Sequence, residues 1–207
     1  MIRVKRFVAA LAVATLAFAA AEAGPPTDVV KTHVEQALEV LAQPSMQGEA
    51  DAAQRREAIR QIAQDAFDFP DMARRTLGQH WRQRTPEERE RFTRLFTALL
   101  ERAYFTRIDA FHQGSVVKYV GEDVEGTTAS VKTVVVTDKG STIPVEYLTH
   151  AVDGRWRIYD VKIESVSLVA NYRAQFNKVI VSSSFEELLR RLEERAGASP
   201  AVSRTGG

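Results

Sequence analysis

Two carboxylates near the end of a predicted strand, Asp160 and Glu164, are the residues whose types and spacing could perform chemistry. A pair of carboxylates can act as general acid and general base when an enclosed cleft holds them beside a substrate. The same two groups can instead be structural, paired with Arg157 or Arg173. The sequence leaves both interpretations open, and it favours the structural one because no other residue supplies a catalytic partner.

These carboxylates belong to the stretch from Trp156 to Phe176, in which a strand-like periodicity changes to a helical one at Leu168. The simplest interpretation is a strand-to-helix connection in which Ser167 caps the helix. Polar side chains gather at this change of period. Those that we expect to fix the joint, or to face a docking partner, are Asp160, Glu164, Asn171 and Arg173.

Most signatures of catalysis and cofactor binding are absent from the sequence. It has no cysteine, no phosphate-binding glycine loop, no dinucleotide fingerprint and no nucleophile elbow. Its histidines are scattered and form no H-E-x-x-H motif: His33, His80, His112 and His150. We therefore expect no metal site, no cofactor and no enzymatic activity.

The charge balance restricts the possible partners. The formal net charge is +1, whereas a nucleic-acid-binding protein is expected to carry a strong basic excess. Arginines concentrate between positions 74 and 94, but Glu87, Glu88 and Glu90 lie among them. This pattern favours a mixed, solvated surface, and the alternative is a docking patch for an anionic lipid surface or a protein partner.

The N-terminal residues are typical of a cleavable export signal. Three basic residues precede an apolar run from Phe7 to Ala21, and Ala21-Glu22-Ala23 has the small-residue spacing of a cleavage site. Cleavage would remove three of the 28 basic residues and one of the 27 acidic residues, leaving 25 and 26. We expect a signal peptide over residues 1–23 and an exported protein, with an N-terminal membrane anchor as the alternative.

The remaining chain predicts one α+β domain over residues 24–196 and a disordered tail over 197–207. Helical periodicity indicates a first helix that starts within the cluster 25–28 and ends at the cluster 43–45. It indicates further helices over about 50–66, 71–78 and 86–103, the last one beginning with a Thr85 capping box. Alternating residues then predict strands over 116–120, 127–137, 141–152 and 155–163. Helices from Leu168 and Phe185 complete the pattern. We expect a twisted antiparallel sheet of four to five strands, covered by helices from both ends of the chain.

Two prolines qualify these boundaries. Pro70 should keep Phe69 out of the helical region, so that the third helix begins at Asp71. Pro144 indicates that the third strand is irregular, or lies at an edge, near its start.

Two blocks of sequence resemble the MlaC family, also called the toluene-tolerance auxiliary family. One block runs from Phe69-Pro70 through the Thr85 cap to Tyr104, and the other runs from Tyr159 to Phe176. The order and spacing of the blocks carry the resemblance, because neither block contains a catalytic motif. One departure is Ser165, where the family often has glycine after the glutamate, and it puts the backbone conformation of that turn in question.

The resemblance implies a periplasmic phospholipid carrier. Such carriers exchange lipid between an outer-membrane lipoprotein–porin complex and an inner-membrane ABC transporter that bears an MCE-domain protein, and so maintain outer-membrane lipid asymmetry. The acyl chains are expected in an apolar cavity between sheet and helices. We expect the sheet side of the cavity to be lined by Tyr119, Val131, Val135, Val145, Tyr147, Ile158 and Val161. The expected helical side comprises Leu77, Trp81, Phe96, Leu99, Tyr104, Leu168 and Tyr172.

Two other classes of protein remain as alternatives. An enzyme on a cone-shaped α+β fold would use Asp160 or Glu164 as base and would need that carboxylate inside a small, closed pocket. A structural adaptor would have a solid core and no cavity. The lining and volume of any interior cavity therefore distinguish the three classes.

Overall fold

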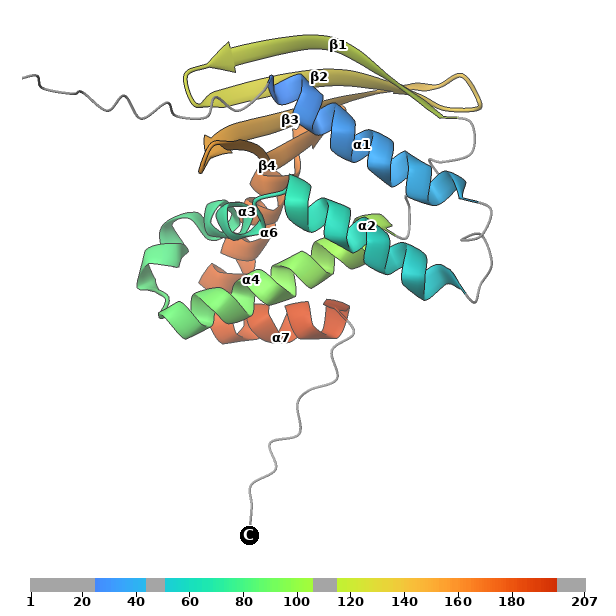
Figure 1. Ribbon diagram of the computed structural model, residues 1–207. Helices are drawn as coiled ribbons and strands as arrows, with labels where there is room; N and C mark the ends of the chain where they lie inside the picture. The colour runs from blue at the N-terminus through green and yellow to red at the C-terminus, as the bar shows by residue number, and fades with distance from the viewer. Residues whose placement is uncertain (1–24, 44–50, 106–114, 197–207) are drawn as a thin grey trace, which may run out of the picture.

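A five-stranded antiparallel sheet forms one layer of the protein, and helices cover one of its faces (Figure 1). The computed structural model describes residues 25–43, 51–105 and 115–196. The strands are β1 (Val116–Glu125), β2 (Thr128–Val136), β3 (Thr142–Val152), β4 (Arg155–Ile163) and β5 (Val166–Ser167). They pair in sequence order, so the predicted α+β meander is confirmed.

Helices come from both ends of the chain, as predicted. Those before the sheet are α1 (Pro26–Ala42), α2 (Ala52–Ala66), α3 (Phe69–Leu77), the 3₁₀ helix η3 (Gly78–Gln83), α4 (Pro86–Leu100) and the π-helix η4 (Glu101–Phe105). Those after the sheet are α6 (Leu168–Ser182) and α7 (Phe185–Ala196). The predicted signal peptide (1–23) and tail (197–207) lie outside the described residues.

Of two helix starts predicted from local residue patterns, that of α4 is confirmed and that of α3 is not. The capping box of α4 is present, with the Glu88 backbone N–H donating to Thr85 Oγ1 at 3.2 Å and the Thr85 N–H donating to Glu88 Oε2 at 2.8 Å. The predicted start of α3 was wrong by two residues. The helix begins at Phe69, because the Asp68 carboxylate accepts the Asp71 N–H at 3.0 Å and so caps an earlier turn.

Pro144 lies in β3 where that strand has a partner on one side only. It pairs with Val134 of β2, but the pairing of β3 with β4 begins at Val145 opposite Ile163. The Pro144 carbonyl accepts the N–H of Glu164 just beyond the end of β4. The missing N–H of proline therefore removes no ladder hydrogen bond, which is why a proline is tolerated in a central strand.

The buried apolar residues form two clusters. The helical cluster joins α3, α4, α6 and α7 around a group of aromatic rings, with Phe92 and Phe96 both 5.6 to 5.9 Å from the ring of Phe176. The sheet-side cluster joins α1 and α2 to the sheet through Val30, Ala66, Val131, Ile158 and Val161. The two clusters leave room for a cavity where the sheet, α1, α2 and the helical cluster meet.

The turn between β4 and β5 has the unusual backbone that Ser165 brings into question. Ser165 has a φ of 68° and Glu164 a φ of 50°, both in the left-handed region. An L-residue pays roughly 1–2 kcal/mol for that conformation, and glycine avoids this cost at the expense of a more flexible unfolded chain.

We expect Ser165→Gly to raise the free energy of unfolding by about 0.5–1 kcal/mol, because glycine relieves the strain at this position. Urea denaturation followed by circular dichroism would measure the change. The matched control is Ser182→Gly at the end of α6, which should lower stability, since glycine weakens a helix. A Ser165→Gly variant less stable than the wild type would contradict this account of the turn.

Candidate functional site

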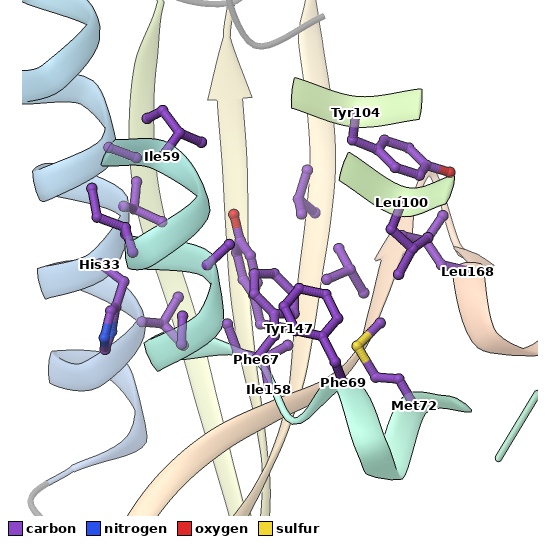
Figure 2. A pocket seen from close by; sticks show the side chains of 18 of the residues that line it. His33, Ile59, Phe67, Phe69, Met72, Leu100, Tyr104, Tyr147, Ile158 and Leu168 are labelled. Atoms are coloured by element: carbon purple, nitrogen blue, oxygen red, sulfur yellow. The ribbon is translucent and has the colours of Figure 1, made fainter. Parts of the chain in front are cut away.

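An apolar cavity of about 310 Å³ lies between the sheet and the helices (Figure 2). Its sheet wall comes from β2, β3 and β4, and its other walls come from α1, α2, the start of α3, the end of α4, Tyr104 of η4 and Leu168 of α6. Its volume falls at the lower end of the range of roughly 300–1,000 Å³ that ligand pockets occupy. The wall consists almost entirely of hydrocarbon, which suits it to apolar chains.

Seven of the fourteen residues predicted for a lipid site line this cavity. They are Tyr104, Val135, Val145, Tyr147, Ile158, Val161 and Leu168. Val131 and Tyr119 belong to the sheet-side cluster that supports the same wall. Alternation accounts for Val145 and Tyr147, because side chains two residues apart in a strand share a face of the sheet. Ile158 and Val161 are three residues apart, and an irregularity in the pairing of β4 with β3 brings both to the same wall.

The other five predicted residues do not line the cavity. Leu77, Trp81, Phe96, Leu99 and Tyr172 all belong to, or pack against, the helical cluster. The apolar faces of α3, α4 and α6 are covered by one another and by α7, so these side chains meet other helices. Leu100 does line the cavity, because one step along a helix turns the side chain by about 100° away from the direction of Leu99.

Sequence reasoning missed the contribution of α1, α2 and the chain that follows them. Ten lining residues come from this region: Val30, His33, Val34, Ala37, Ile59, Ile62, Ala63, Ala66, Phe67 and Phe69. Met72 of α3 lies beside them in Figure 2. Most of these positions are recognisable as apolar helical faces, but periodicity alone does not say whether such a face meets a neighbour or a cavity.

The few polar side chains in the cavity wall are occupied by other contacts. His33 Nδ1 lies 2.7 Å from the Val29 carbonyl and its Nε2 lies 3.2 Å from Asp65 Oδ2. The hydroxyl of Tyr104 interacts with that of Tyr172, and Tyr147 interacts with Thr133. Burial raises the pKa of Tyr147 to about 12, so its phenol stays neutral in a neutral solution.

Asp160 fixes the joint between β4 and α6. Its side chain is only 5% exposed, and its Oδ1 accepts the backbone N–H of Val161 at 2.8 Å and of Val169 at 3.0 Å. Its Oδ2 accepts the hydroxyl of Ser167, which in turn caps α6 by accepting the Ala170 N–H at 2.9 Å. The carboxylate thus connects the strand end to the first turn of the helix.

The other polar residues of this stretch lie apart from Asp160. Arg173 Nε donates to the Arg75 carbonyl at 2.7 Å and so ties α6 to the end of α3. Arg157 donates to the carbonyls of Gln64 and Phe67. The pairing of Asp160 or Glu164 with these arginines is therefore not observed in the described part of the chain. Glu164 and Asn171 are exposed.

The cavity separates the three classes that the sequence left open. Neither Asp160 nor Glu164 lines it, and Asp160 uses both oxygens within the fold, so neither carboxylate faces a substrate-sized space there. The sheet and helices enclose a cavity, whereas a structural adaptor was expected to have a solid core. Within residues 25–43, 51–105 and 115–196, no group of three or more metal-ligating side chains converges. No helix in those ranges is long and apolar enough to cross a membrane.

Comparison with known proteins supports this description. A crystal structure described as the phospholipid-binding protein from Ralstonia solanacearum in complex with a phospholipid superimposes with a TM-score of 0.74. The two sequences are 24% identical, and the match covers 84% of this chain and 98% of that one, so the two proteins share a fold. No curated protein matches this sequence. The family model for the MlaC protein matches residues 31–194, and the chain is therefore a member of the MlaC family.

Proposed function

We propose that this protein is a phospholipid carrier that holds acyl chains in the cavity between the sheet and α1, α2 and α4. The observation that carries the proposal is the apolar cavity of about 310 Å³, found in a member of the MlaC family. The protein of the same fold from Ralstonia solanacearum is described in complex with a phospholipid, which supports a related ligand here. With this volume, the cavity takes in part of the acyl chains and leaves the headgroup at its mouth.

Elementary energetics explain why a carrier needs such a cavity. Exposing one methylene group to water costs about 0.8 kcal/mol, so two acyl chains of ordinary length cost on the order of 20 kcal/mol. A hydrocarbon wall removes that cost during transit. The bilayer removes it equally, so the net free energy of moving a lipid from bilayer to carrier is small. This near balance lets a carrier both load and unload without chemistry, cofactor or catalytic residue.

The proposed setting is the periplasm, reached through the export signal over residues 1–23. The proposed partners are an outer-membrane lipoprotein–porin complex and an inner-membrane ABC transporter with an MCE-domain protein. Carriage between them would maintain outer-membrane lipid asymmetry. Membership of the MlaC family supports this assignment, and the residue pattern expected of an export signal at positions 1–23 agrees with it.

Transfer of lipid between vesicles tests the proposal. Donor vesicles carrying a fluorescent phosphatidylglycerol and a non-exchangeable quencher would be mixed with unlabelled acceptor vesicles. The purified protein should accelerate appearance of the fluorophore in the acceptors, in proportion to protein concentration. Transfer no faster than the spontaneous rate would contradict a carrier function.

A further inference from the structure

Helices α1 and α2, which form one side of the cavity, are tied to the sheet at one end. At the start of α1, the Thr27 N–H donates to Glu122 Oε2 of β1 at 2.7 Å. At the end of α2, Arg157 of β4 donates to the carbonyls of Gln64 and Phe67, both at 2.7 Å. The two helices pack on each other with the start of α1 beside the end of α2. These ties therefore hold the same end of the pair, which we call the anchored end.

Further along, α2 meets η4 at a seam that borders the cavity. Ile59 of α2 lies on one side of the cavity, and Leu100 and Tyr104 lie on the other (Figure 2). From α2, the helical cluster includes Ala63, whose small side chain gives this seam little apolar contact. On the other side of the seam, η4 is a π-helix, a rare geometry that occurs frequently at functional sites.

An ion pair crosses this seam. Arg60 Nε of α2 donates to Glu101 Oε2 of η4 at 3.0 Å, and Arg60 Nη1 also pairs with Glu57 of its own helix. The side chains of Arg60 and Glu57 are 40% and 51% exposed, whereas that of Glu101 is partly buried. Ion pairs with exposed partners contribute little stability, because solvent and salt screen them. If the pair across the seam breaks, Arg60 keeps Glu57 as a partner, so opening leaves no unpaired cation.

The size of the cavity gives a reason for the seam to open. An apolar cavity of about 150 Å³ takes up one benzene molecule, so the present cavity of about 310 Å³ holds on the order of a dozen carbons. The two chains of a phospholipid contain more carbons than that. The cavity must therefore widen to hold both chains, and widening costs little at a seam held by an alanine contact and a screened ion pair.

We propose that Arg60 and Glu101 form a latch, and that lipid enters and leaves the cavity when this latch opens and α2 moves away from η4 about the anchored end. This inference rests on the proposed function. Glu57 modulates the latch in a defined direction. The carboxylates of Glu57 and Glu101 share one guanidinium group and repel each other, so Glu57 weakens the closed state.

Neutral variants of the two carboxylates should change the rate of lipid transfer between vesicles in opposite directions. Glu101→Gln removes the partner across the seam and should speed transfer about two- to fivefold, the range that corresponds to an exposed ion pair. Glu57→Gln removes the repelling carboxylate and should slow transfer by a similar factor. An ion pair that only stabilises the fold would not produce opposite effects on the rate. Effects of the same sign, or none, would overturn the latch.

Cross-linking tests where the cavity opens, and the chain has no cysteine of its own to interfere. Arg60→Cys combined with Glu101→Cys would be bridged across the seam by a bismaleimide that contains a reducible disulfide. The bridged protein should transfer lipid at no more than about a tenth of the unbridged rate, and reduction should restore that rate. The matched control is the same bridge at the anchored end, between Thr27→Cys and Glu122→Cys, which should leave transfer unchanged.

The outcomes separate this inference from the function on which it rests. Unchanged transfer by the protein bridged between positions 60 and 101 would overturn the latch and leave the carrier function standing. Equal slowing by the bridge at the anchored end would also overturn it, because the movement would then not be specific to the seam. Absence of transfer by the wild type would refute the carrier function and this inference together.

Discussion

Ala37→Trp should reduce the lipid bound per protein by more than tenfold without unfolding the protein. Ala37 is on the face of α1 that lines the cavity, and an indole there occupies space that acyl methylenes would otherwise fill. Each methylene excluded costs about 0.8 kcal/mol, so losing two already changes the binding constant by about tenfold. Extraction and counting of lipid after incubation with vesicles would measure the loss.

A control variant and a stability measurement show whether Ala37→Trp acts by filling the cavity or by disturbing the fold. The same substitution at Ala53, an exposed position of α2, should leave lipid binding unchanged. Filling a cavity adds apolar contacts, so Ala37→Trp should unfold at the same denaturant concentration as the wild type or a higher one. Full lipid occupancy in a folded Ala37→Trp protein would mean that the chains bind elsewhere.

Asp160→Ala should lower the free energy of unfolding by about 3 kcal/mol. It leaves the N–H groups of Val161 and Val169 and the hydroxyl of Ser167 without their acceptor, at a site that is 5% exposed. A buried donor left unpaired costs about 1–3 kcal/mol, and water entering the alanine cavity recovers part of that sum. Urea denaturation monitored by circular dichroism and by tryptophan fluorescence would give the value.

Asp160→Asn is the graded comparison. Its carbonyl oxygen still accepts both N–H groups, and its amide can donate to Ser167 Oγ. The variant therefore loses only the extra strength that the negative charge gives to these hydrogen bonds, and its free energy of unfolding should fall by about 1 kcal/mol. Glu164→Gln, on the exposed neighbour of this joint, should change stability by less than about 0.5 kcal/mol. Equal effects of Asp160→Ala and Glu164→Gln would show that Asp160 does not hold the joint.

Local signals were enough to predict most of the fold. The Thr85 capping box and the Asp153-Gly154 turn each act over a few residues, and each appears where it was predicted. The strands also start close to their predicted positions, but the first one was predicted to end at residue 120 and continues to Glu125, past a pairing irregularity between Tyr119 and Gly121. The start of α3 was misplaced because the side chain of Asp68 outweighed the conformational bias that Pro70 imposes. The prediction considered only the effect of Pro70 on Phe69, and it did not consider a cap at Asp68, one residue before the helix.

The candidate site was predictable only in part. Strand alternation identified Val145 and Tyr147, because every second side chain of a regular strand shares one face. Ile158 and Val161 are three residues apart and share the cavity wall because the pairing of β4 with β3 is irregular between them, which alternation alone does not predict. The helices gave no such information. An apolar helical stripe looks the same whether it packs on another helix, as Phe96 packs on α6, or borders a cavity, as Ala37 does. Only the tertiary arrangement decides between the two.

The polar residues around Asp160 illustrate a second limit. Sequence spacing suggested ion pairs with Arg157 or Arg173, but both guanidinium groups donate to main-chain carbonyls of segments nearly a hundred residues away. Hydrogen bonds to the backbone leave no trace in residue types. The role of the Asp160 carboxylate at the joint between β4 and α6 therefore follows only from the tertiary structure.

The central claim is that the cavity holds phospholipid, and the mass of the protein tests it most directly. Protein expressed from the full sequence and purified without detergent would be measured by native mass spectrometry, then delipidated and offered phosphatidylglycerol vesicles. We expect a phospholipid-sized increment that disappears on denaturation and returns after incubation with vesicles. A protein that carries no lipid as purified and takes up none from vesicles would contradict the account.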